Sequence, residues 1–115
     1  MKTKTPAIIN LHNRAAKFGL GDVIMHRKQG YRGVVVDVDA EFEGREEWLD
    51  DAALATAPKD HPWYRVLVDG SDMETYVVED NLEVDDLGEP VEHPHVDFFF
   101  SEFYHGHYVS RQTVN

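Results

Sequence analysis

A run of branched apolar residues in the first third of the chain constrains the fold most. Residues 31–39 include Val34, Val35, Val36 and Val38. β-Branched side chains favour extended backbone, and an unbroken run of this length is typical of a strand that is buried in part on both faces. The sequence therefore predicts a central β-strand here.

Further strands are predicted on both sides of this run. Residues 23–26 form a shorter strand, joined to the central one by a turn at residues 27–30. Later in the chain, residues 63–68 and 74–78 read as a hairpin around the turn at residues 69–72. Consecutive antiparallel strands of this length predict a mainly β protein built on a small barrel.

Two helices are predicted outside these strands. Residues 43–54 have helix-forming composition, and Trp48 lies on the side that would dock on the barrel, so we expect a helical insertion. Near the C-terminus, apolar residues recur at the i, i+3, i+4 and i+7 positions of a short amphipathic helix, which leaves Phe98 off the apolar face. The expected organisation is an N-terminal arm (1–17), one β domain ending in this helix (18–104) and a tail (105–115). The four residues of the apolar face are Val96, Phe99, Phe100 and Phe103.

Composition narrows the function classes. The 115 residues suffice for one domain, and the net charge is −11. This charge is unevenly distributed: residues 1–32 hold seven basic residues and one acid, Asp22, whereas the remaining 83 residues hold four basic and 21 acidic ones. An acidic chain disfavours general affinity for DNA, although a local basic patch at Arg27, Lys28 and Arg32 is possible.

No signal for catalysis, a metal or a membrane is found. The chain has no cysteine, so disulfides and thiolate metal sites are excluded, and no apolar run is long enough to span a bilayer. The histidine pairs His93/His95 and His105/His107 lack the i, i+4 spacing that places two imidazoles on one helical face. We therefore expect a cytoplasmic, non-enzymatic protein with no cofactor and no metal site.

The aromatic residues are the better candidates for binding. Trp63 and Tyr64 are adjacent in a predicted strand, so one should point inward and the other outward. The outward residue either covers a neighbouring loop or joins Tyr31 and Arg32 in an exposed patch that grips a peptide or a base. Both alternatives remain open at this level.

The ordered set of these motifs resembles a known family. It resembles the heat shock protein HspQ family, also known as the YccV-like or hemimethylated-DNA-binding domain, over roughly residues 18–103. The residues that carry the resemblance are Lys17-Phe18-Gly19-Leu20-Gly21-Asp22, His26, Gly30-Tyr31-Arg32-Gly33-Val34-Val35-Val36-Asp37-Val38-Asp39, His61-Pro62-Trp63-Tyr64, Glu74-Thr75-Tyr76-Val77-Val78 and Glu79-Asp80-Asn81-Leu82.

The resemblance implies an SH3-like barrel without catalytic residues. It also implies a role in protein quality control, in which the protein acts with a Lon-type protease on denatured or specific substrates. The alternative that it implies is binding of hemimethylated DNA, and it further suggests a homotrimer. Because the chain is acidic, a protein partner is the preferred prediction. The candidate partner-binding residues are Arg27, Lys28, Tyr31, Arg32, Trp48, Trp63 and Tyr64.

Overall fold

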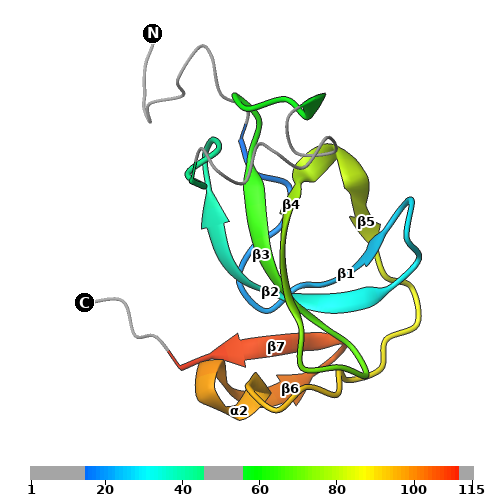
Figure 1. Ribbon diagram of the computed structural model, residues 1–115. Helices are drawn as coiled ribbons and strands as arrows, with labels where there is room; N and C mark the ends of the chain where they lie inside the picture. Colours follow the sequence, from blue (N-terminus) through cyan, green and yellow to red (C-terminus); the bar gives the residue numbers. More distant parts are fainter. Residues whose placement is uncertain (1–14, 46–55, 112–115) are drawn as a thin grey trace, which may run out of the picture.

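The computed structural model describes residues 15–45 and 56–111, which form two antiparallel sheets (Figure 1). The larger sheet has five strands in the order β4-β3-β2-β1-β5, and the smaller one pairs β6 with β7. The prediction of a mainly β fold is confirmed. The predicted helical insertion lies for the most part outside the described residues. The strands are β1 (Val23–His26), β2 (Arg32–Asp39), β3 (Trp63–Val68), β4 (Glu74–Val78), β5 (Leu82–Val84), β6 (Phe100–Tyr104) and β7 (His107–Ser110).

The hairpins of the larger sheet follow the sequence prediction. β1 pairs with β2, β2 with β3, and β3 with β4, all antiparallel. A 3₁₀ turn, η2 (Glu79–Asn81), then leads into the short strand β5, which returns to pair with β1. In the described part of the chain the sheet is strongly curved, but its edge strands β4 and β5 do not pair, so a closed barrel is not seen (Figure 1).

Strand alternation divides the apolar residues between the two faces of the sheet. On the concave side, Ile24, Val35, Tyr64 and Val66 pack with Leu82. The other side packs against the C-terminal segment, in a cluster whose members are Val23, Val34, Val36, Leu67, Val91, Phe100 and Tyr108. Both faces of the central strands are therefore buried, as the branched run predicts.

The C-terminal prediction of an amphipathic helix is wrong beyond its first turn. α2 (Val96–Phe99) has only four residues, and the chain continues as the β6–β7 hairpin. At the hairpin turn, His105 has φ 52° and Gly106 has φ 77°, two consecutive left-handed residues that match the twist of a tight hairpin. The part of the predicted tail that the structure describes is therefore largely strand β7.

The small sheet is attached to the large one through β7. The Tyr108 backbone N–H donates to the carbonyl oxygen of Gly21 (3.0 Å), and Asp22 forms a bridge with His107. The Tyr108 hydroxyl accepts a hydrogen bond from the Val91 N–H (2.9 Å). A Cβ atom on Gly21 would lie 2.2 Å from the backbone carbonyl oxygen of Tyr108, so this close approach of β7 requires glycine.

The close packing of β2 on β3 yields a stability prediction. In Gly33→Ala, the new Cβ would lie 2.4 Å from Val66 Cγ1 and 2.6 Å from the Leu67 oxygen. We expect the free energy of unfolding, measured by urea denaturation, to fall by about 1–3 kcal/mol because the core is overpacked. Gly19→Ala is the control, since no atom lies within 4 Å of its added Cβ. Equal stability of the two variants would contradict the described packing.

Candidate interaction surface

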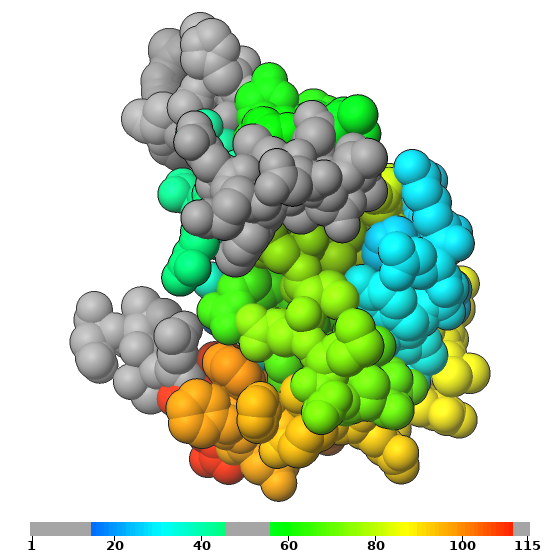
Figure 2. All heavy atoms as spheres, in the orientation of Figure 1, coloured from blue at the N-terminus to red at the C-terminus, as the bar shows by residue number. Residues whose placement is uncertain are grey.

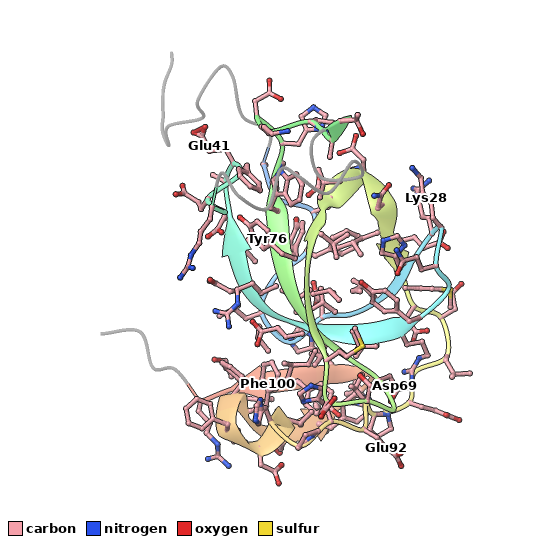
Figure 3. The ribbon with its side chains drawn as sticks, viewed as in Figure 1. Lys28, Glu41, Asp69, Tyr76, Glu92 and Phe100 are labelled. Atoms are coloured by element: carbon pink, nitrogen blue, oxygen red, sulfur yellow. The ribbon has the colours of Figure 1, made fainter. Side chains whose placement is uncertain are left out.

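The β1–β2 turn presents the predicted basic residues. His26 is buried, and its Nδ1 accepts hydrogen bonds from the backbone N–H groups of Lys28 (3.1 Å) and Gln29 (3.0 Å). Burial lowers the pKa of His26 below its usual value of 6.5, and the Lys28 ammonium lowers it further. The neutral imidazole thus shapes the turn and leaves the Arg27 and Lys28 side chains exposed. Lys28 projects from the tip of the turn in Figure 3.

Arg32, the third basic candidate, is held inside the molecule. Its guanidinium makes a bidentate ion pair with Asp85 (Nε–Oδ1 3.1 Å, Nη2–Oδ2 3.2 Å) and a further one with Asp69 (3.0 Å). Its side chain is 13% exposed and that of Asp85 is 1% exposed. The hydrogen bonds from Arg32 to Asp85, followed by the charges of both aspartates, raise the pKa of Arg32 against the opposing effect of burial.

The same guanidinium fixes the connection between the two sheets. It donates to the carbonyl oxygens of Glu89 (2.5 Å) and Pro90 (3.4 Å). Asp69 extends this network, because its Oδ1 accepts the Glu92 N–H (2.7 Å), and the two residues lie close together in Figure 3. Arg32 is therefore a structural centre, and its charge is already neutralised.

The two strand aromatics, Trp63 and Tyr64, are both fully buried, so of the two alternatives the exposed patch is not formed by either residue, and the outward one is covered. Trp63 stacks on Tyr76 (centroids 5.2 Å apart) and meets Phe42 edge to face (5.0 Å). Phe42 belongs to the connection after β2, which covers this end of the outer face. Strand alternation holds, but both faces are covered.

Tyr64 lies on the concave side and is tied to a buried carboxylate. Its hydroxyl donates to Glu79 Oε1 (2.5 Å), which also accepts the Lys17 N–H (2.8 Å). Burial, followed by this hydrogen bond, raises the pKa of Tyr64. The Phe18 N–H donates to the Tyr64 hydroxyl (3.2 Å), so Tyr64 anchors the segment that enters β1.

Of the remaining candidates, Tyr31 is half-buried, and Trp48 lies outside the described residues. The Tyr31 hydroxyl is hydrogen-bonded to Thr75 Oγ1 (2.8 Å), and its ring packs on His26 (5.1 Å). Burial raises the pKa of Tyr31. Among the candidates that the structure describes, the predicted patch of aromatic and basic side chains is thus not assembled: only Arg27 and Lys28 are largely open to solvent.

Two open pockets flank the C-terminal segment. One, of about 340 Å³, lies between β6 and the loop before α2, and is lined by Val96, Phe103 and the acidic residues Glu92, Asp97 and Glu102. The other, of about 410 Å³, lies between the outer face of β2 and β3 and the α2–β7 region. Phe98, 77% exposed as predicted, lines this second pocket with Arg111. Sequence reasoning did not identify Arg111, because only the fold brings it beside β2.

Residues 15–45 and 56–111 contain neither a cluster of metal-ligating side chains nor a helix that could span a membrane. No group of three or more histidine or acidic side chains there is placed to hold a metal ion. His107 is paired with Asp22 (2.9 Å), and His93 contacts the Met73 carbonyl oxygen (3.0 Å). No helix among these residues is long and apolar enough to cross a membrane.

The buried ion pair yields a stability prediction. Arg32→Gln leaves Asp85 buried without its partner, so we expect the free energy of unfolding to fall by about 3–5 kcal/mol. The double variant Arg32→Gln/Asp85→Asn removes the orphaned charge and should recover a large part of this loss. Arg45→Gln makes the same change at an exposed arginine and should change stability by less than about 0.5 kcal/mol. A small loss in Arg32→Gln would show that the pair is not needed.

His26 yields a pH prediction. Because its pKa is lower in the folded than in the unfolded chain, the unfolded chain binds more protons below about pH 6.5, and folding is disfavoured there. We expect stability to fall from about pH 7.5 to about pH 5.5 more steeply in the parent than in His26→Asn, whose side-chain oxygen accepts the same N–H groups. Parallel denaturation profiles of the two proteins would contradict this.

Comparison with known proteins identifies the family. Residues 16–107 match the model of the family described as hemimethylated DNA-binding protein YccV like. The match begins just before the segment that Tyr64 anchors, contains strands β1 to β6, and ends at the first residue of β7. It agrees with the resemblance of the sequence motifs. The chain therefore belongs to the YccV-like family, a family of the hemimethylated-DNA-binding type.

Proposed function

We propose that this protein is a non-enzymatic quality-control factor that modulates the degradation of denatured or specific proteins by a Lon-type protease. The observation that carries the preference for a protein partner is the internal neutralisation of Arg32 by Asp69 and Asp85. It leaves only Arg27 and Lys28 well exposed in the predicted basic patch of a chain with net charge −11. Two exposed cations offer little affinity for phosphates at physiological salt.

Exposed apolar side chains also support a protein partner. Several large ones are more than half exposed. Such side chains favour contact with apolar parts of another polypeptide, as found in the cores of protein interfaces. The protease assignment itself rests on the family resemblance. The side chains in question are Met73, Val84, Leu87, Phe98 and Tyr104.

The proposal includes the SH3-like barrel that the resemblance implies. The five-stranded antiparallel sheet, curved around Ile24, Val35 and Tyr64, is compatible with this architecture. The homotrimer and the cytoplasmic location remain predictions. Sedimentation or light scattering at several protein concentrations tests the trimer directly.

A reconstituted degradation assay tests the proposal. We expect a purified Lon-type protease to degrade an unfolded protein substrate at a rate that changes, saturably, with the concentration of this protein, and we expect a pull-down to recover the protease. An unrelated protein of similar size and net charge serves as the control. If turnover is unchanged and no protease is recovered, the proposed function is wrong.

Binding of hemimethylated DNA is the second candidate, favoured by the description of the family. Arg27 and Lys28 are then the expected phosphate contacts, because both are exposed in the β1–β2 turn. With two phosphate contacts, the logarithm of the DNA association constant should fall with the logarithm of the salt concentration, with a slope of about −2. The double variant Arg27→Ala/Lys28→Ala should abolish DNA binding. Fluorescence anisotropy at several salt concentrations measures both, with fully methylated duplex as the control. Absence of binding even at low salt would exclude this function.

A further inference from the structure

The pocket of about 410 Å³ on the outer face of the sheet has an apolar floor. Val36 of β2 and Phe100 of β6 form its buried part, at 8% and 2% exposure, and Leu20 and Phe99 are half-buried beside them. Two segments cover the outer face of the sheet: Phe42 packs on Trp63 at one end, and the C-terminal segment packs on Leu67 at the other. The floor of the pocket lies between these two covers. We call this pocket the outer groove.

Phe98 forms one rim of the outer groove. It is the most exposed of the large apolar side chains in the described part of the chain, at 77%, and it meets the ring of Phe99 edge to face (centroids 5.2 Å apart). Its helix lies at the lower left of the molecule, where the space-filling view shows the side chains protruding (Figure 2). A side chain that enters the groove would therefore contact a ring that is now in water.

The charges at the groove are not equivalent. Arg65 is neutralised, since its guanidinium pairs with Glu74 and lies 3.9 Å from Asp37. Arg111 has no carboxylate partner in residues 15–45 or 56–111. Its Nε donates to the Asp97 carbonyl oxygen (2.8 Å) and its backbone N–H to the Phe99 oxygen (2.9 Å). These bonds orient the guanidinium, and neither uses its Nη atoms.

We propose that the outer groove binds a peptide segment in which a bulky apolar side chain adjoins a carboxylate. The apolar side chain lies on Val36, Phe99 and Phe100, and Phe98 closes over it. The carboxylate, from an acidic side chain next to the apolar one, accepts hydrogen bonds from the Nη atoms of Arg111. An oriented guanidinium favours this geometry, and an aromatic residue beside an arginine is the composition of strongly contributing interface positions.

Charge complementarity selects this partner in an otherwise acidic molecule. With net charge −11, the protein repels acidic polypeptides in general, so an acidic group is accepted only where a cation without a carboxylate partner meets an apolar surface. The inference rests on the proposed function only in that the partner is a protein. It adds the chemistry by which a protease segment or its substrate is recognised.

Direct titration of the full-length protein with labelled peptides tests the inference. The probes are a capped peptide with a Phe-Asp pair, the same peptide with Phe-Asn, a peptide ending in Phe with a free carboxylate, and its amidated form. We expect saturable binding of the Phe-Asp peptide and about tenfold weaker binding of the Phe-Asn peptide, because a hydrogen-bonded charge is lost. Binding of the free-carboxylate peptide without binding of the Phe-Asp peptide would assign the groove to the end of a chain instead and would overturn the inference.

Variants localise the site. Arg111→Gln should weaken the charged probe about tenfold and leave the neutral probe unchanged. Phe98→Ser should weaken both probes and leave the fold intact, because Phe98 is 77% exposed, and a thermal melt checks the fold. Arg45→Gln makes the same change of charge at another exposed arginine, outside the groove, and should bind as the parent does.

Three further results would overturn the inference: no saturable binding up to about 1 mM peptide, equal binding of charged and neutral probes, or parent-like binding by Arg111→Gln. Loss of duplex DNA binding in Arg111→Gln, with no peptide bound, would assign the groove to nucleic acid instead. Peptide binding without any effect on proteolysis would sustain the groove and refute the protease role. An effect on proteolysis that survives Arg111→Gln and Phe98→Ser, in a protein that binds none of the peptides, would do the reverse.

Discussion

The structure depends on the buried ion pair between Arg32 and Asp85. Arg32 opens the central strand β2, and Asp85 follows β5, the last strand of the large sheet. Together with the carbonyl groups of Glu89 and Pro90, the pair fixes the path by which the chain leaves the large sheet toward Val91 and the C-terminal hairpin. Because both partners are desolvated, each requires the other. This requirement, together with the attachment of β7 at Gly21, sets the position of the small sheet.

The cover of the sheet's outer face decides which side chains are available to partners. Trp63 would be exposed on a bare sheet, but the connection through Phe42 buries it. At the other end of the face, Tyr108 and Phe100 of the hairpin bury Val34 and Val36. Between these two covers the face stays open, and there the groove forms with Phe98 on its rim. Among residues 15–45 and 56–111, the accessible aromatic surface thus comes from the C-terminal segment, not from the strands that carry the family motifs.

Sequence reasoning succeeded where the signal is local. The branched residues of β2 and the turn at Asp69 predict the central strands, because strand propensity and turn chemistry act over a few residues. It failed at Phe99, Phe100 and Phe103, whose spacing suits a helix, although His105-Gly106 is a hairpin turn signal that could have shown the strands. Burial of Trp63 and Tyr64, the pairing of Arg32 and the position of Arg111 all arise from contacts distant in sequence.

The energetics of Arg32 also limit how the basic segment can meet a partner. Freeing its guanidinium for a phosphate or an external carboxylate would leave Asp85, at 1% exposure, buried and unpaired, at a cost of about 3–5 kcal/mol. An ion pair formed at the surface in exchange returns only about 0–1 kcal/mol. Arg32 therefore stays with its internal partners when a ligand approaches. An anion is then better bound by a cation that has no buried acidic partner to leave behind. Arg27 and Lys28 are such cations at the turn, and Arg111 is one beside the apolar floor of the groove.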